Sequence, residues 1–197
     1  LISEATRNFG KDLALAFAVE GSNLMLASRD NPEHLEQTTQ EVQTLGVQAS
    51  TSQCDLSNES QVEDLLGQCV SKLGSLEVVV NNVLFPMPQQ SLEEIPFELW
   101  KRKFDVETTG SFLLFKQVIP QMIQQQWGRV INFTGLDAFN GADIMSSATD
   151  MGLVGLTRGI AREYGKYNIT ANCIGPGGIE NEEAEGLHPV PPSQRDA

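Results

Sequence analysis

Basic residues are scarce in this chain of 197 residues, which has 13 Lys and Arg against 26 Asp and Glu and a net charge of −13 at pH 7. A surface that binds nucleic acid needs clustered Lys and Arg on one face. The acidic balance likewise opposes binding to an anionic membrane. We therefore expect neither nucleic acid nor membrane among the partners of this protein.

Long apolar runs are also absent. No stretch approaches the roughly 20 apolar residues that span a bilayer. The N-terminus lacks the basic, apolar and small-residue regions, in that order, of a signal peptide. The length fits a single globular domain, for which about 100–200 residues is usual. The sequence thus predicts one soluble, cytoplasmic domain.

Cysteine and histidine are too few for a disulfide framework or a zinc site. Cys54, Cys69 and Cys173 lie in strand or helix patterns without Cys-x-x-Cys spacing, so we expect buried, reduced thiols and no metal. His34 falls on a polar helix and His188 in an acidic tail. Neither histidine supports a Ser–His nucleophile.

The rest of the chain alternates between apolar runs of strand length and stretches with helical spacing. Runs of Val, Ile and Leu without polar alternation suit strands that are covered on both faces. The sequence therefore predicts an α/β fold, a doubly wound parallel sheet with helices on both faces, which is the Rossmann fold. The expected strands lie at 1–3, 24–28, 47–54, 76–81, 129–133 and 169–174, and the expected helices around 13–18, 31–45, 59–73, 97–125 and 149–164.

Composition divides the chain into a folded domain over residues 1–179 and a tail over 180–197. The tail is rich in Glu and contains Pro189, Pro191 and Pro192. It cannot bury enough apolar surface to fold alone. We expect a flexible loop or frayed terminus in preference to a docking element.

Several short motifs occur in a fixed order along the chain: Cys54-Asp55-Leu56, Val80-Asn81-Asn82, the segments 127–132, 152–158 and 164–172, and Gly175-Pro176-Gly177. In this order they resemble the motifs of the short-chain dehydrogenase/reductase family across almost the whole chain. The resemblance implies a Rossmann fold, an NAD(P) cofactor, hydride transfer at a carbinol or carbonyl carbon, and a homo-oligomer. Such proteins continue beyond the point where this chain stops, so its C-terminal part is expected to be missing.

The glycine loop departs from the family pattern Thr-Gly-x-x-x-Gly-x-Gly. Residues 3–10 keep only the last glycine, Gly10, while Glu4 and Asn8 replace the other two. The glycines let the backbone approach the pyrophosphate at a helix N-terminus. A carboxylate at Glu4 would repel that dianion. We therefore expect weakened dinucleotide binding.

Other positions matching the family's cofactor site are mixed. Arg7 and Arg29 stand where members preferring NADP carry basic residues, and Asp55 where an acid contacts adenine. If a dinucleotide binds, the resemblance implies NADP rather than NAD, held by Arg7, Gly10, Arg29, Asp55 and Asn81. The alternatives are two surface arginines, a turn cap at Asp55, and helix–sheet packing at Gly10.

All four catalytic positions of the family carry other residues. The tyrosine falls on Ser146, the lysine on Asp150, the serine on Gly135 and the asparagine on Glu107. The family's chemistry needs a phenol whose pKa is lowered by a nearby ammonium. The two tyrosines, at 164 and 167, lie at the far end of the expected helix. We therefore expect neither Ser146 nor Gly135 to be active.

Glu107 and Asp150 occupy positions that the family brings to one chain of water molecules, so we expect them to face each other. One pKa of such a pair should rise. The pair could then act as acid and base in a lyase or hydrolase step, or could hold a cation. Drift of polar residues into a solvated cleft is the alternative.

Three functions follow from these readings. The leading hypothesis is a divergent family member that keeps the fold, lacks the usual hydride transfer, and binds a ligand or a partner subunit. The alternatives are an NADP-dependent oxidoreductase with a non-standard proton donor, and a lyase or hydrolase that uses Glu107 and Asp150.

Overall fold

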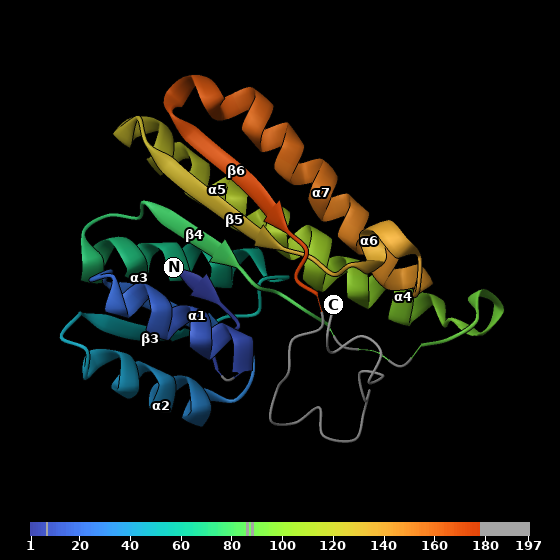
Figure 1. The fold of residues 1–197 in the computed structure, drawn as a ribbon, viewed down its shortest axis with the longest axis horizontal. Helices are drawn as coiled ribbons and strands as arrows, with labels where there is room; N and C mark the ends of the chain where they lie inside the picture. Colours follow the sequence, from blue (N-terminus) through green and yellow to red (C-terminus); the bar gives the residue numbers. More distant parts are fainter. Residues whose placement is uncertain (7, 86, 88, 178–197) are drawn as a thin grey trace.

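The computed structural model describes residues 1–6, 8–85, 87 and 89–177, and its strands form one parallel sheet (Figure 1). The six strands have the spatial order β3-β2-β1-β4-β5-β6, and every neighbouring pair is parallel. From β1 the chain adds β2 and β3 on one side, and it then adds β4, β5 and β6 on the other side. This reversal of strand order between β1 and β4 confirms the doubly wound fold. The strands are β1 (Ile2–Ser3), β2 (Leu24–Ser28), β3 (Ala49–Gln53), β4 (Val78–Asn81), β5 (Gly128–Phe133) and β6 (Ile169–Ile174).

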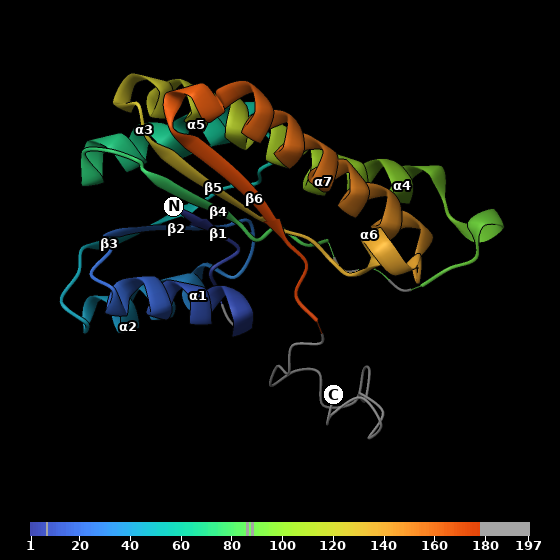
Figure 2. The ribbon, with the colours of Figure 1, turned by 45° about the horizontal axis from the view of Figure 1, so that its top comes forward.

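Helices cover both faces of the sheet, as the fold class requires. Figure 2 shows α1 and α2 on one face and α3, α5 and α7 on the other. The helices are α1 (Asn8–Val19), α2 (Pro32–Gln43), α3 (Glu59–Leu73), α4 (Phe97–Phe104), α5 (Gly110–Gln125), α6 (Asp137–Asn140) and α7 (Ile144–Tyr164), with short 3-10 helices η1 (Leu92–Glu94) and η3 (Gly165–Tyr167).

Two helical predictions need correction. The stretch expected as helix over 97–125 is divided into α4 and α5 by a five-residue π-helix, η2 (Asp105–Thr109), a feature often found at functional sites. The last helix starts at Ile144 rather than at 149, because the Asp143 side chain accepts a hydrogen bond from the Ser146 backbone N–H at 2.7 Å. Such a cap satisfies a donor that the helix itself leaves free.

The apolar core lies in two layers, one on each face of the sheet. Successive strand residues point to opposite faces. Met25 and Val79 accordingly pack in the layer under α3, α5 and α7, while Leu26 and Val80 pack in the layer under α1 and α2. Covering both faces is the reason these strands carry continuous apolar runs.

All three cysteines carry free thiols. Cys54 and Cys69 are buried as predicted, and Cys173 is partly buried. Burial raises the pKa of the Cys54 thiol to about 12, so it stays protonated at neutral pH. Within the described part of the chain, no helix combines the length and apolar character needed to cross a membrane.

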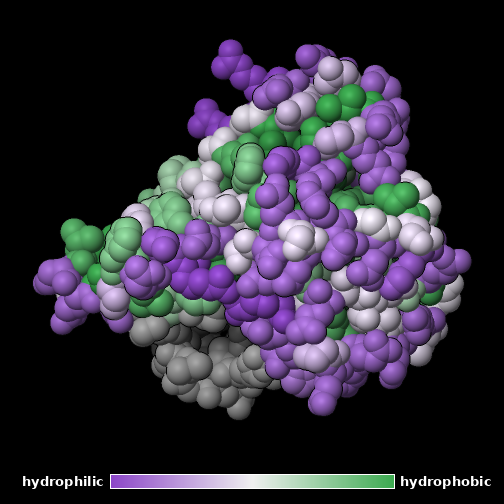
Figure 3. All heavy atoms as spheres, turned by 180° about the vertical axis from the view of Figure 1, so that it is seen from behind, coloured by the Kyte–Doolittle hydropathy of each residue, from purple (hydrophilic) through white to green (hydrophobic). Residues whose placement is uncertain are grey.

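Apolar side chains also reach the surface, in green among the hydrophilic purple of Figure 3. On α5, Phe112 is 50% exposed. Side chains of α5 and α7, Phe112, Ile119 and Leu156 among them, line a groove of about 620 Å³. This surface lies away from the carboxyl ends of the strands, where ligands bind in sheets of this type.

Candidate functional site

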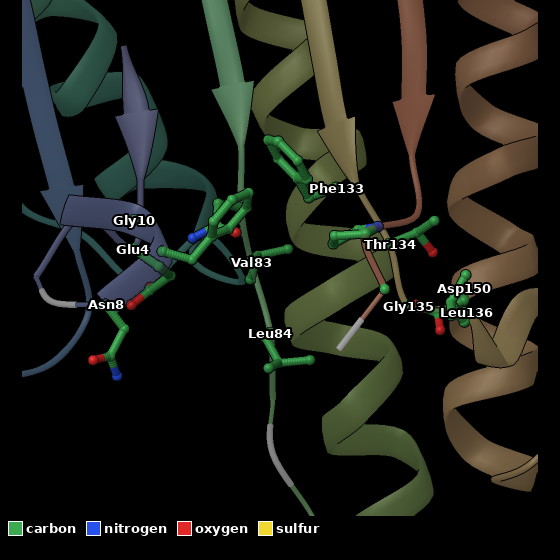
Figure 4. A pocket seen from close by; sticks show the side chains of 14 residues that line it. Glu4, Asn8, Gly10, Val83, Leu84, Phe133, Thr134, Gly135, Leu136 and Asp150 are labelled. Atoms are coloured by element: carbon green, nitrogen blue, oxygen red, sulfur yellow. The ribbon is translucent and has the colours of Figure 1, made fainter. Parts of the chain in front are cut away.

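A cavity of about 550 Å³ lies at the carboxyl ends of β1, β4 and β5 (Figure 4). The strand order reverses between β1 and β4, and open α/β sheets bind their ligands in the crevice at that point. Its described lining comes from five parts of the chain, each close to the end of a strand or the start of a helix: Glu4 with Asn8, Phe9 and Gly10; Asn82 to Leu84; Phe133 to Leu136; Asp150; and Pro176 with Gly177.

The loop between β1 and α1 keeps a backbone typical of glycine without having the glycines. Glu4 and Asn8 both have φ of 50°, in the left-handed region that favours glycine. A Cβ added to Gly10 would lie 2.1 Å from the Glu4 carbonyl oxygen. The helix–strand packing role considered for Gly10 is therefore confirmed, because only a glycine lets α1 approach β1 this closely.

The Glu4 carboxylate lines the cavity and is turned toward the end of β2. It accepts hydrogen bonds from the Ser28 hydroxyl at 2.8 Å and from the Arg29 backbone N–H at 3.3 Å. Burial raises the pKa of Glu4, and these two hydrogen bonds oppose the rise. The position that the family pattern assigns to a glycine thus places an acid at the mouth of the loop.

Arg29 and Asp55 both have partners within the protein. The Arg29 guanidinium donates to Asp30 at 2.6 and 2.8 Å. The Asp55 carboxylate pairs with Arg102 at 3.0 Å and accepts from the Ser57 backbone N–H at 2.9 Å, which confirms its role in the turn. The space that these residues line together with Glu4 has only about 20 Å³, roughly the room for one water molecule. Arg7 and the tail 180–197 lie outside the described residues.

Asn81 is fully buried and does not line the cavity. Its side chain accepts from the Ser3 hydroxyl and donates to Ser111 and Asn132, each donated bond being 2.7 Å long. This network joins β1, β4, β5 and α5 beneath the cavity. The neighbouring Asn82, which was not among the predicted cofactor residues, lines the cavity instead.

Gly135 and Asp150 meet at one end of the cavity, as Figure 4 shows. A Cβ on Gly135 would lie 2.7 Å from one Asp150 carboxylate oxygen. Asp150 is 6% exposed and lines the cavity. Burial raises the pKa of Asp137, the charges of Asp150 and Asp143 raise it further, and the Lys103 ammonium opposes the rise. This end of the cavity is therefore acidic.

Glu107 does not form the expected pair with Asp150. It lies in the π-helix, where one oxygen accepts from the Lys103 ammonium and from the Phe85 backbone N–H, both at 2.8 Å, and the other accepts from the Thr149 hydroxyl at 2.6 Å. Lys103 and Glu107 are both buried. Because an ammonium one helical turn away compensates its charge, Glu107 is bound within the fold and is absent from the described cavity lining.

Ser146 lies in the first turn of α7 and is also absent from the described cavity lining. Tyr164, at the other end of α7, is 14 residues from Asp150, the α7 residue that lines the cavity, which is about 21 Å along a helix. The tyrosines therefore lie far from the cavity, as predicted.

Sequence reasoning missed Lys103, the cation that holds Glu107. The signal was present as a Lys and a Glu at i and i+4 in a helical stretch, a spacing that places two side chains side by side. The spacing does not indicate whether the pair is buried, and most Lys–Glu pairs at this spacing are exposed. Phe133 and Leu136, which line the cavity with apolar side chains, were also missed.

Comparisons with known proteins agree with this fold. A family model described as short chain dehydrogenase matches residues 1–189. The chain is 29% identical over 189 residues to a 3-oxoacyl-[acyl-carrier-protein] reductase of Staphylococcus epidermidis, covering 95% of this chain and 77% of the relative. The structure of NAD+-bound xylitol dehydrogenase is 28% identical with a TM-score of 0.85 and covers 89% and 68% of the two chains. Acetoin dehydrogenase from Salmonella typhimurium is 27% identical with a TM-score of 0.82, over 90% and 74%.

Proposed function

The chain belongs to the short-chain dehydrogenase family, and we propose that within this family it binds a small molecule without carrying out the usual hydride transfer. The proposal concerns the cavity at the carboxyl ends of β1, β4 and β5. It is argued from two features of this cavity, the replaced catalytic residues and the altered glycine loop.

The observation that carries the proposal is the pairing of Gly135 with Asp150. At the positions that match the family's serine and lysine, the cavity has no hydroxyl and a carboxylate in place of an ammonium. An anion there would oppose ionisation of a phenol, and Ser146 has no comparable acidity. Proton transfer to or from a substrate oxygen by the usual route therefore has no donor in the described lining.

The nucleotide side of the site supports the same proposal. Glu4 adds a negative charge where a pyrophosphate would approach the start of α1. Arg29 is engaged by Asp30, and the space beside it and Asp55 holds about 20 Å³. A dinucleotide would have to displace these groups before it could bind.

An NADP-dependent oxidoreductase with a non-standard proton donor is the second candidate. It is favoured by the backbone at Glu4 and Asn8, which keeps the geometry of a glycine loop, and by the reductase and dehydrogenases that resemble the chain. Water or a residue outside 1–177 would have to supply the proton. An acid–base enzyme using Glu107 with Asp150 has less support, because Lys103 already binds Glu107.

Calorimetric titration with NADPH and NADH tests the proposal. We expect the wild type to bind neither at micromolar concentration and to oxidise neither in the presence of ketones. Glu4→Gly is expected to bind NADPH about tenfold tighter than the wild type, because removing one like charge is worth about 1.4 kcal/mol. Glu4→Gln separates the loss of charge from the loss of the side chain.

The opposite result is equally clear. Micromolar NADPH binding with turnover by the wild type would establish the oxidoreductase. In that case Arg29→Ala should weaken NADPH more than NADH, because the arginine would contact the 2′-phosphate. Equal weakening of NADPH and NADH binding would contradict the assignment of NADP as the cofactor.

We further propose that two copies of the chain associate through the apolar surface of α5 and α7, since homo-oligomers are implied by the family. Support comes from the groove of about 620 Å³ and from Phe112, which lines it and is 50% exposed. Exposed apolar patches of this kind commonly mark interfaces.

Sedimentation velocity tests this surface. Phe112→Glu is expected to convert a dimer into a monomer, because it buries a charge in the interface. Val19→Glu is the control, since Val19 is 70% exposed on α1, away from the groove. A monomeric wild type, or equal effects of the two variants, would contradict the proposed interface.

A further inference from the structure

Two polar groups with little exposure line one end of the cavity, and one of them is a buried hydroxyl without a partner among the described residues. Asp150 is 6% exposed, and its side chain borders the cavity. Thr134 is 7% exposed, and its hydroxyl is buried without a partner in the same part of the chain. Buried polar groups are nearly always satisfied. Both residues line the cavity, so a ligand there could satisfy them.

Gly135 leaves the space that the Asp150 carboxylate needs. A Cβ at position 135 would lie 2.7 Å from a carboxylate oxygen of Asp150, closer than two such atoms can approach. The Asp150 carboxylate can therefore keep this position only if residue 135 is a glycine. Their combination, in place of the family's serine and lysine, converts this end of the cavity from one that donates protons into one that accepts hydrogen bonds.

The charge of the cavity points to the same class of ligand. Its described lining contains two carboxylates, Glu4 and Asp150, and no Lys, Arg or His. A buried, unpaired charge is costly unless an opposite charge compensates it. Val83, Phe133 and Leu136 contribute apolar side chains to the same lining. An anion such as a pyrophosphate is disfavoured here, while an organic cation gains from both carboxylates.

We infer that this cavity binds an organic ammonium ion, whose N–H groups donate to the Asp150 carboxylate and the Thr134 hydroxyl while its apolar body lies against Val83, Phe133 and Leu136. The inference deepens the proposed function and rests on it in one respect, namely that no dinucleotide fills the cavity. Glu4 contributes attraction at longer range, through its charge.

A matched series of probes tests the charge preference. Phenylethylammonium, 2-phenylethanol and phenylacetate have similar size and carry positive, zero and negative charge. We expect saturable binding of the cation, followed by NMR of the 15N-labelled chain, with shifts of the Thr134 and Gly135 amides. The alcohol should bind roughly 10- to 100-fold more weakly, because it loses a charge-assisted hydrogen bond. Phenylacetate should show no saturable shift.

Two variants locate the interaction. Asp150→Asn is expected to weaken the cation by roughly 10- to 100-fold and to leave the alcohol unchanged. Gly135→Ala should have the same effect without altering any charge, because its Cβ displaces the carboxylate. Asp12→Asn is the control, since Asp12 is an exposed carboxylate on α1 and reports the general attraction of an acidic protein for cations.

Equal affinities for the cation and the alcohol, or an Asp150→Asn variant that binds as the wild type does, would overturn the inference. If the variants fail to fold, the probe series on the wild type still decides it. Titration with NADPH and NADH is a separate experiment that tests the proposed function. Tight dinucleotide binding would remove the proposed function, whereas the charge preference measured without nucleotide tests the ammonium site itself.

Discussion

Lys103→Met is expected to destabilise the fold by about 3–5 kcal/mol, because it leaves the carboxylate of Glu107 buried without its cation. The two side chains are 3% and 2% exposed and their charged atoms are 2.8 Å apart. Lys103 also donates to the Phe85 carbonyl at 3.2 Å. The loss should appear in urea unfolding followed by circular dichroism as a lower midpoint with an unchanged slope.

A double variant distinguishes the loss of an ion pair from the loss of packing. Lys103→Met with Glu107→Gln removes the uncompensated charge and keeps an amide whose oxygen can accept from the Phe85 backbone N–H while its NH2 group donates to the Thr149 hydroxyl, so most of the stability should return. Lys101→Met is the control. Lys101 lies on the same helix, is about half exposed and pairs with Glu98 at 3.5 Å, so its loss should change the free energy of unfolding by less than about 0.5 kcal/mol.

If Lys103→Met costs no more than the Lys101 control, the buried pair does not hold the structure. The expected large effect would instead show that the pair stabilises the contact between three parts of the fold. Through Glu107 the pair joins Phe85 after β4, the π-helix, and Thr149 next to Asp150 on α7. The cavity end formed by Asp150 therefore depends on a charge pair that is itself outside the described lining.

Gly10→Ala is expected to destabilise the fold by at least about 2 kcal/mol, because the new Cβ would lie 2.1 Å from the Glu4 carbonyl oxygen and 3.1 Å from the Ala5 Cα. Both obstacles are backbone atoms, so no side chain can rotate away. Relief requires α1 to move from β1, which would also deform the lining of the cavity at Asn8. Thermal and urea unfolding measure the loss.

Gly67→Ala provides the matched control for this substitution. Gly67 lies exposed in α3, and a Cβ there would meet nothing within 4 Å. Alanine in an open helical position is expected to stabilise by about 0.5–1 kcal/mol. Opposite signs for the two glycines would establish that close helix–strand packing, not glycine flexibility, accounts for Gly10. A neutral Gly10→Ala would mean that the loop relaxes freely.

Local pattern determined most of the fold. The strands at 24–28 and 169–174 and the helix at 59–73 have the predicted bounds, because apolar runs, turn residues and caps act over a few neighbouring residues. The parallel order followed from alternating strands and helices. Matching motifs also placed Gly135 and Asp150 at one site, since both positions count from segments close by in the chain.

Tertiary structure alone decided which partners the polar side chains take. Nothing near Glu107 in sequence indicates that Thr149 and Phe85 donate to it, or that Glu4 turns to Ser28 across 24 residues. Burial removes water as a partner, so each buried polar group must find one within the fold, and the folding of distant segments decides which is near. The sequence by itself therefore determined the Rossmann framework, and it is also the basis for our proposal that the phenol–ammonium pair is absent. The separation of Glu107 from the cavity, and the presence of Asp150 and Thr134 together in its lining, depend on contacts between distant segments.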